Sequence, residues 1–222
     1  MRAAFLALVI ALASPALAAE APHPLPSPAY DPAPEKPGLQ KITVAGGCFW
    51  GVQAVFQHVP GVERAVSGYA GGEAATAHYE VVSEGHSGHA ESVEITYDPA
   101  RVSLGALLRV HFSVVHDPTQ SNRQGPDVGP QYRSAIFVSD DAQKRVVAEY
   151  LAQLAAAKAF DAPIVTRVEP LKGFYPAETY HQDYLVHHPD SPYIRYNDLP
   201  KVAALKQLMP ALYREQPKLV HE

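Results

Sequence analysis

Cysteine is almost absent from this chain: Cys48 is the only one among 222 residues. A single thiol excludes a disulfide within the chain, and it excludes the zinc sites that several cysteines build. The helical zinc motif H-E-x-x-H is also missing, and His86 and His89 lie three apart in a Gly/Ser loop rather than on a helix. We therefore expect no bound metal or cofactor.

Clusters of basic residues are missing as well. The chain has 18 Lys and Arg against 23 Asp and Glu, which gives a formal net charge of −5. Nucleic acids and anionic membrane surfaces attract proteins through patches of positive charge. We therefore expect neither of them as a partner.

No apolar run reaches the ~20 residues that a membrane-spanning helix needs. Residues 3–18 come closest; they follow Arg2 and end in Ala16-Leu17-Ala18. This arrangement is typical of a secretory signal peptide with an A-x-A cleavage site, and a membrane anchor is the alternative. Residues 1–18 thus predict export, with the periplasm as the expected destination and no membrane attachment after cleavage. A lone cysteine in an exported chain indicates a reactive thiol or an intermolecular bond.

Proline is concentrated in one segment. Residues 19–38 contain seven prolines, which block helix and ladder hydrogen bonds and favour extended conformations. We interpret this segment as a disordered or semi-rigid linker, followed by one folded domain over residues 39–222.

The hydrophobic pattern of the domain begins with strand, helix, strand, strand, helix and strand. Strands are predicted at 41–45, 62–69, 93–97 and 132–138, and helices at 52–59 and 103–115, the second capped by Ser103. This order predicts an α+β fold, a two-layer sandwich whose mixed sheet is built around a ferredoxin-like split βαβ (βαββαβ) unit. A helix over 140–160, a strand at 164–168 and a helix over 200–209 complete it, while 70–80 and 121–130 are predicted loops.

Cys48 lies where a predicted strand passes through Gly46-Gly47 into a predicted helix. The unpaired N–H groups and the dipole at a helix N-terminus favour the thiolate, which is the nucleophilic form. The alternative is a buried cysteine that only fills space. The position favours a catalytic thiol, and the neighbouring Phe49 and Trp50 could form an apolar wall for a small group bound beside the sulfur.

Glu91 shares its strand parity with Val93 and Ile95, so the period of two directs its carboxylate toward the apolar face. Burial raises the pKa of a carboxyl group, which suits a general acid near neutral pH. A carboxylate that bends out to water at the strand end is the alternative. Tyr79 and Tyr132 could donate hydrogen bonds to a substrate oxygen, although ordinary packing is the favoured explanation for each tyrosine taken by itself.

Seven ordered motifs resemble those of the A-type peptide methionine sulfoxide reductases. They are GGCFWG (46–51), GYAGG (68–72), HYEVV (78–82), GHAESVEITYDP (88–99), HDPT (116–119), QGPDVGPQYRSAIF (124–137) and FYPAETYHQDYL (174–185). The resemblance covers about residues 40–199 and implies an α+β fold with a catalytic reductase domain over 39–222.

The resemblance also implies a reaction: methionine-S-sulfoxide, free or in oxidised proteins and peptides, is reduced to methionine in protein repair. Cys48 would attack the sulfoxide sulfur and become a sulfenic acid. Glu91 would protonate the sulfoxide oxygen. The remaining roles fall to Tyr79 and Tyr132 as helpers of Glu91, Asp127 on the polar side of the pocket, and Phe49 and Trp50 around the S-methyl group.

The sequence departs from many members of that family at its C-terminal end. Those members carry further cysteines there, which resolve the sulfenic acid as a disulfide, whereas residues 197–222 contain none. We therefore expect an external thiol reductant, either a thioredoxin-like protein or a small thiol. As a separate expectation, the chain acts as a monomer.

Three other functions are weighed against this hypothesis. A thiol hydrolase would pair Cys48 with one of 11 histidines, and a thiol peroxidase would need an arginine near the thiolate, whereas the first arginine after Cys48 is Arg64. A binding module for methionines would leave Cys48 without a chemical role.

Overall fold

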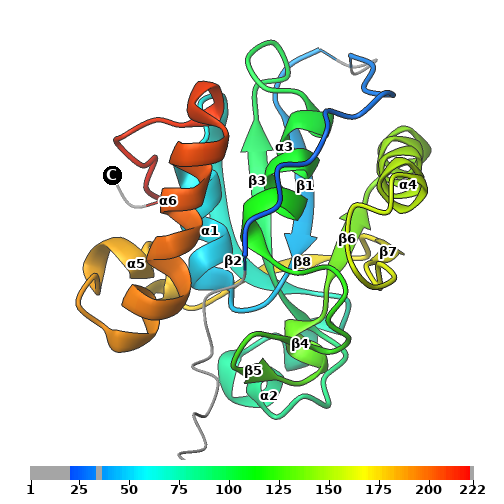
Figure 1. Ribbon diagram of the computed structural model, residues 1–222. Helices are drawn as coiled ribbons and strands as arrows, with labels where there is room; N and C mark the ends of the chain where they lie inside the picture. Colours follow the sequence, from blue (N-terminus) through cyan, green and yellow to red (C-terminus); the bar gives the residue numbers. More distant parts are fainter. Residues whose placement is uncertain (1–20, 34–36, 221–222) are drawn as a thin grey trace, which may run out of the picture.

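A six-stranded mixed sheet forms the centre of the molecule in the computed structural model, which describes residues 21–33 and 37–220 (Figure 1). The strand order is β7-β6-β1-β3-β2-β8. The strands are β1 (Gln40–Ala45), β2 (Val62–Ala70), β3 (Ala90–Tyr97), β6 (Ala135–Val138), β7 (Arg167–Pro170) and β8 (Phe174–Pro176). The helices are α1 (Phe49–Gln57), α2 (Tyr79–Ser83), α3 (Leu104–Val110), α4 (Asp141–Ala156), α5 (Tyr184–His187) and α6 (Leu199–Leu208).

Short elements fill the connections between these. Strands β4 (Arg123–Gln124) and β5 (Asp127–Val128) form a separate two-stranded sheet. Two π-helical turns occupy His111–Val115 and Ile194–Asp198. The 3₁₀ turns are Ala74–Thr76, Pro130–Tyr132, Thr179–His181 and Pro210–Leu212.

The topology of the sheet places the C-terminal end of β1 beside the N-terminal end of β3. Strand β3 lies between β1 and β2 and runs antiparallel to both, while β6 is antiparallel to β1 and parallel to β7. Helix α1 connects β1 to β2 and packs on β2 and β3. The expected α+β architecture with a mixed sheet is confirmed, and the residue that follows β1 and the first residues of β3 lie at the same end of the sheet.

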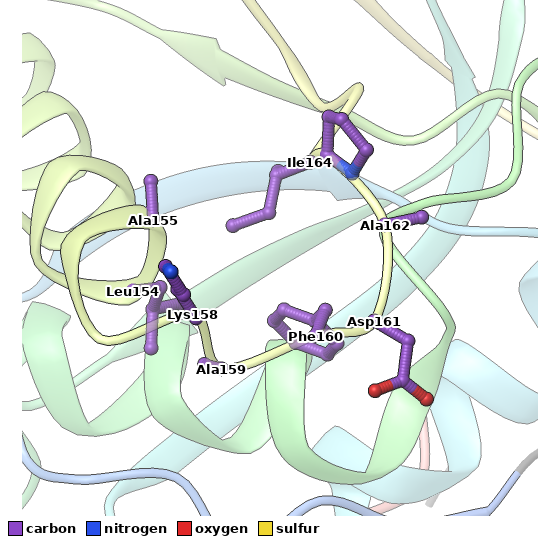
Figure 2. A pocket seen from close by; sticks show the side chains of 9 residues that line it. Leu154, Ala155, Lys158, Ala159, Phe160, Asp161, Ala162 and Ile164 are labelled. Carbon is purple, nitrogen blue, oxygen red and sulfur yellow. The ribbon is translucent and has the colours of Figure 1, made fainter.

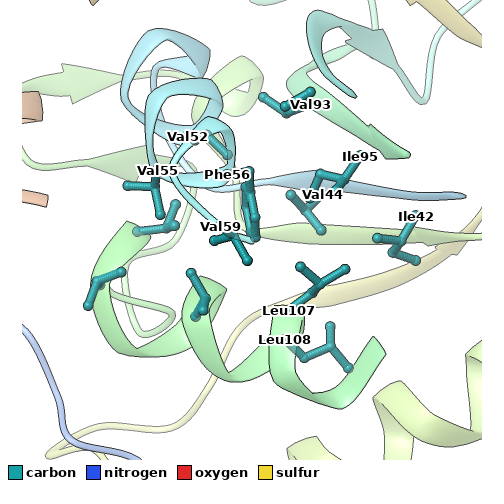
Figure 3. Close-up of a cluster of buried hydrophobic side chains, with 14 of the residues drawn as sticks. Ile42, Val44, Val52, Val55, Phe56, Val59, Val93, Ile95, Leu107 and Leu108 are labelled. Atoms are coloured by element: carbon teal, nitrogen blue, oxygen red, sulfur yellow. The ribbon is translucent and has the colours of Figure 1, made fainter. Parts of the chain in front are cut away.

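The main core lies between the sheet and the helices that cover it. Val52, Val55, Phe56 and Val59, spaced for one helical face, are all at most 1% exposed. In Figure 3 they meet the side chains of β1 and β3 and those of α3, which include Leu107. This spacing correctly predicted α1 because i, i+3, i+4 and i+7 share one face of a helix.

Smaller side chains cover the opposite face of the sheet near the same end. Ala45, Ala70, Ala90 and Ala135 are fully buried and cluster with Phe137. Small side chains on this face leave room for the 3₁₀ turn Pro130–Tyr132, which contacts β3. Near the C-terminal end of the chain, Met209 directly follows the last residue of α6 and is 5% exposed.

Several predicted boundaries were wrong. The predicted loop at 70–80 contains a 3₁₀ turn and the start of α2, and Tyr132 lies in a 3₁₀ turn that precedes β6. The predicted strand 164–168 begins only at Arg167, and the predicted helix 103–115 continues after α3 as a π-helical turn. Ser103 does cap α3, because its hydroxyl accepts a hydrogen bond from the N–H of Ala106 at 3.1 Å.

The proline-rich segment, as far as the structure describes it, is not a free linker. Residues 21–33 lie along α3 and α4 as a strap, drawn in dark blue across α3 in Figure 1. The guanidinium of Arg109 donates to the carbonyl of Leu25 at 2.7 Å, and Tyr150 donates to the carbonyl of Pro26 at 2.9 Å. Leu25 itself is 4% exposed. The expectation of a disordered linker was wrong here because extended prolines leave carbonyls free for donors on the helices. The predicted signal peptide lies outside the described residues.

Asp31 attaches the strap to the start of α3, and its replacement by alanine should destabilise the protein. Its carboxylate accepts hydrogen bonds from the N–H of Gly105 at 2.9 Å and from the hydroxyl of Ser103. A carboxylate at a helix N-terminus contributes ~1 kcal/mol. Urea unfolding of Asp31→Ala should therefore give a free energy of unfolding about 1–2 kcal/mol below that of the wild type. The exposed Asp190, replaced in the same way, should change nothing; equal values for both variants would contradict a stabilising strap.

No helix of the described ranges is long and apolar enough to cross a membrane.

Candidate active site

Cys48 occupies the N-cap position of α1, directly after the two glycines. Gly47 has φ +89°, a left-handed conformation that glycine adopts without strain. A Cβ at Gly47 would come within 2.8 Å of the Gln124 side chain, and a Cβ at Gly46 within 2.8 Å of the His116 ring. Only glycines therefore let the chain turn between these neighbours and place the sulfur at the start of the helix.

Glu91 reaches the same helix end from β3. Its Oε2 accepts a hydrogen bond from the backbone N–H of Phe49 at 3.0 Å, and the residue is 3% exposed. Burial raises its pKa to about 8; the hydrogen bond from Phe49 partly opposes this, and Asp127 and Asp198 add to it. The strand parity thus predicted the direction of this side chain correctly. The carboxyl group holds a proton through neutral pH, and its partner Phe49 is the residue next to the thiol.

The predicted preference of Cys48 for the thiolate was wrong. Burial, the largest cause, raises the pKa of the thiol well above its ordinary value, and the negative charges of Glu91 and Asp198 raise it further. The N–H of Trp50 donates to the sulfur and lowers the pKa, as expected at a helix N-terminus, but it does not outweigh burial. Cys48 is 7% exposed and holds its proton at neutral pH in this arrangement.

Two tyrosines approach the thiol and Glu91 from separate elements. Tyr79 begins α2, where its N–H donates to Glu178 at 2.9 Å, and Tyr132 ends the 3₁₀ turn before β6. Burial and the charge of Glu91 raise the pKa of both hydroxyls. Both hydroxyls therefore stay protonated and able to donate hydrogen bonds.

Asp127 lies on β5, in the predicted loop, and is held by a tyrosine that sequence reasoning missed. The hydroxyl of Tyr193 donates to its Oδ2, and Tyr193 also packs edge-on against Trp50, with ring centroids 5.8 Å apart. Burial raises the pKa of Asp127, while the bond from Tyr193 and the charge of Lys201 lower it. The C-terminal segment therefore helps to build the site.

Phe49 and Trp50 form the apolar side of the site. Phe49 is 1% exposed, and Trp50 stacks on Tyr184 at 3.8 Å with an interplanar angle of 6°. The indole N–H of Trp50 donates to Nδ1 of His181 at 3.1 Å, and the His181 ring lies 5.0 Å from that of Phe49. The orientation of Trp50 is thus fixed on two sides, by stacking and by a hydrogen bond.

The motif at 181–183 anchors α1 in the domain, a role that sequence reasoning did not assign. Gln182 accepts from the Gln53 amide at 2.8 Å, and Asp183 accepts from the Gln57 amide at 2.6 Å. Both glutamines are on α1 and are 1% exposed. Two buried glutamines on the face of a helix were the signal that a polar partner would come from elsewhere in the chain.

A separate cavity of about 400 Å³ lies away from these residues. Figure 2 shows its lining, which runs from the end of α4 through the loop up to Ile164 and includes Lys158, Phe160 and Asp161. It contains none of the residues around Cys48. Within the part of the chain that the structure describes, no three His, Cys, Asp or Glu side chains are grouped as a metal site would need.

The fold and the site define a class: an enzyme with one buried thiol, a neighbouring carboxyl acid and an aromatic wall. Comparison with known proteins specifies it further. The family model for peptide methionine sulfoxide reductase matches residues 40–211. A peptide methionine sulfoxide reductase MsrA 2 from Mesorhizobium japonicum is 62% identical over 184 residues, which cover 83% of this chain and 94% of that protein. A peptide methionine sulfoxide reductase MsrA from Chromobacterium violaceum is 48% identical over 76% of this chain and 96% of its own.

Solved structures of methionine sulfoxide reductases are also similar to this chain. The reduced form of Mxr1 from Saccharomyces cerevisiae has a TM-score of 0.63 and 36% identity, covering 73% of this chain and 90% of that one. Methionine sulfoxide reductase A of Corynebacterium diphtheriae has a TM-score of 0.58 and 36% identity, with 70% and 77% covered. The chain belongs to the peptide methionine sulfoxide reductase family. It is an oxidoreductase that reduces methionine sulfoxide, so the hydrolase, peroxidase and binding-module interpretations were wrong.

Proposed function

We propose that the chain reduces the S-epimer of methionine sulfoxide, free and in oxidised proteins or peptides, through Cys48 and a sulfenic acid. The contact that carries the proposal is the one between Glu91 and the N–H of Phe49. It holds a carboxyl with a pKa of about 8 beside the residue that follows the thiol. A sulfoxide oxygen leaves poorly unless it is protonated, and a protonated buried carboxyl supplies that proton.

The residues around Cys48 have distinct chemical roles in the proposed reaction. Cys48 attacks the sulfoxide sulfur while Glu91 protonates the sulfoxide oxygen, with Tyr79 and Tyr132 as hydrogen-bond donors. In the net step the S–O bond of the substrate breaks and one forms at Cys48. The substrate sulfur is reduced by two electrons and the Cys48 sulfur is oxidised by two, giving methionine and Cys48 sulfenic acid.

The apolar and polar sides of the site would orient the substrate. Phe49 and Trp50 hold the S-methyl group, since thioether-like groups pack favourably on aromatic rings. Asp127, held by Tyr193, lies on the polar side. If the site fixes both the methyl group and the oxygen, it accepts one sulfoxide epimer. The opposite epimer would place its oxygen on the aromatic side and its methyl group on the polar side.

Three expectations about the chain as a whole belong to this proposal: export to the periplasm, action as a monomer, and a ferredoxin-like unit in the fold. Export rests on residues 1–18 alone. The ferredoxin-like split βαβ unit is supported by the position of β3 between β1 and β2, the two strands that α1 connects.

A single-turnover reaction tests the function. Reduced protein is mixed with dabsyl-methionine sulfoxide that contains both epimers at sulfur, without any reductant, and the two epimers of the remaining substrate are separated by chromatography. We expect about one equivalent of methionine per protein, formed from the S-epimer only. Methionine formed from the R-epimer, or none from folded protein, would overturn the proposal.

The reductant is the second part of the proposal. Because Cys48 is the only cysteine, an external thiol must reduce the sulfenic acid: it forms a mixed disulfide and water, and a second thiol then releases Cys48. Glutathione added after one turnover should therefore raise the protein mass by one glutathionyl group, and dithiothreitol or thioredoxin should restore multiple turnovers. Turnover with neither reductant would contradict this step.

A further inference from the structure

His116 lies in contact with the turn that carries Cys48, although the proposed reaction gives it no role. It is the first residue of the HDPT motif and is buried. A Cβ on Gly46 would come within 2.8 Å of Cγ of His116 and within 3.1 Å of Cε1 of His111. The two imidazole rings lie 4.2 Å apart. Gly46 therefore packs directly on a pair of buried histidines, two residues before the thiol.

The hydrogen bonds of His116 fix both its orientation and its tautomer. Its Nδ1 lies 3.2 Å from the carbonyl oxygen of His111, which can only accept, so Nδ1 carries the proton. Burial lowers the pKa of His116 to about 4, so the ring is neutral at neutral pH and Nε2 is an acceptor. The hydroxyl of Ser134 therefore donates to Nε2 at 2.7 Å, and it accepts from the hydroxyl of Thr166 at 2.7 Å. The ring is thus held on two sides.

The same hydrogen bonds connect the thiol segment to Tyr132. Ser134 lies two residues after Tyr132, between the 3₁₀ turn Pro130–Tyr132 and β6. The imidazole of His116 contacts Gly46 with one part of the ring and Ser134 with another. One buried side chain therefore spans the gap between the turn before Cys48 and the segment that carries Tyr132.

Gln124 makes the corresponding contact with Gly47. A Cβ on Gly47 would come within 2.8 Å of Cβ of Gln124, which is 3% exposed. The Gln124 amide donates to the carbonyl of Asp117 at 2.6 Å and accepts from its N–H at 3.2 Å, which ties Gln124 to the residue after His116. Gln124 is also the cross-strand partner of Asp127 in the β4–β5 pair. The second glycine is therefore held by the hairpin that carries Asp127.

We propose that His116 and Gln124 are positioning residues that hold the Gly-Gly turn, and with it Cys48, in place relative to the groups that act on the substrate. The inference rests on the proposed role of Cys48 as the nucleophile. The glycines have no side chains that could fix the turn, so these two contacts supply the restraint. A displacement of ~1 Å at a reacting atom costs up to ~10²-fold in rate. Substrate binding should change little, because stacking and a hydrogen bond fix Trp50 separately.

His116→Leu tests the inference, because leucine fills much of the space but makes neither hydrogen bond. The single-turnover rate constant is measured over a series of methionine sulfoxide concentrations, all in excess of protein. We expect the limiting rate to fall about 10- to 100-fold, while the concentration that gives half of this rate changes by less than about twofold. Iodoacetamide alkylation of Cys48, which is 7% exposed in the wild type, should become about fivefold faster, because the loosened turn opens more often.

His58→Leu is the matched control. His58 is also buried and lies 2.8 Å from a backbone carbonyl, that of Arg214, but it caps the opposite end of α1 from Cys48. Its replacement should lower the thermal unfolding midpoint without changing the limiting rate or the alkylation of Cys48. Equal losses of rate in His58→Leu and His116→Leu would show a general loss of stability and overturn the inference.

Ser134→Ala and Gln124→Ala carry the test if His116→Leu does not fold, as judged by circular dichroism. The first removes the hydroxyl that orients the His116 ring, and the second removes the side chain packed on Gly47. We expect each to lower the limiting rate about threefold to tenfold. Wild-type limiting rates in the folded variants would overturn the inference. If the wild-type protein forms no methionine, the proposed function fails, whereas the alkylation rates still show whether these contacts hold the thiol.

Discussion

Cys48→Ser abolishes the reduction of methionine sulfoxide, with an expected loss of at least about 10⁴-fold in single-turnover rate. Serine has nearly the size of cysteine, but its hydroxyl does not accept the sulfoxide oxygen in a two-electron oxidation. The fold should remain, because serine is among the preferred N-cap residues and its hydroxyl can accept the N–H of Trp50 in place of the Cys48 sulfur. The measurement that checks this loss is the amount of methionine formed per protein molecule in a single turnover.

The thermal unfolding midpoint of Cys48→Ser is the control. We expect a value equal to that of the wild type or higher, since the new hydroxyl can accept an N–H of the first turn. An inactive variant that is fully folded assigns the chemistry to the sulfur. A folded variant that still produced one equivalent of methionine would show that the oxygen acceptor is another group.

Glu91→Gln has the second-largest expected effect, and it acts in opposite directions on activity and stability. Glutamine retains an oxygen that can accept the N–H of Phe49, but it does not protonate the sulfoxide oxygen. Loss of a general acid costs ~10²–10⁴-fold in rate. The single-turnover rate at pH 7 should fall by that factor, whereas iodoacetamide alkylation of Cys48 should persist.

The stability of the same variant should exceed that of the wild type as pH rises. The pKa of Glu91 is about 8 in the folded protein and 4.5 in its ordinary state, so the folded form binds more protons between these values. The free energy of unfolding therefore decreases as pH rises through that window. A pKa difference of one between the folded and unfolded states corresponds to ~1.4 kcal/mol, so the gain in stability should reach a few kcal/mol at pH 8.

Urea unfolding at pH 4.5 and at pH 8 measures this difference between Glu91→Gln and the wild type. Glu94→Gln is the matched control, because Glu94 lies on the same strand with opposite parity and pairs with Lys41 at 2.8 Å on the surface. It should show no such gain. An equal pH dependence for Glu91→Gln and the wild type would contradict the buried, protonated carboxyl.

Local periodicity was enough to predict the parts of the site that depend on one element. The position of Cys48 before α1 and the direction of Glu91 follow from patterns within ten residues of each. The protonation state of Cys48 does not, because burial depends on how distant segments cover the helix end. A helix N-terminus was visible in the sequence, whereas the carboxylate of Asp198 beneath it was not.

Local patterns also could not predict the contacts of the strap or those of the C-terminal residues around the site. Asp31 caps a helix that begins more than 70 residues later, and His181 fixes Trp50 across an even longer separation. No spacing rule connects such pairs, so their roles become visible only in the folded structure. Polar side chains on a buried helix face, such as Gln53 and Gln57, are the local trace that these contacts leave.

The burial of Met209 has a consequence for the enzyme as a potential substrate of its own reaction. The chain contains two methionines, and Met209 is the one within the described residues, 5% exposed beneath the end of α6. Oxidation of a methionine requires that the oxidant reach its sulfur, and the sulfoxide is polar and disrupts a core. Burial keeps oxidants away from the thioether of Met209 in the folded protein. This methionine therefore does not become a sulfoxide that another copy of the enzyme would have to reduce.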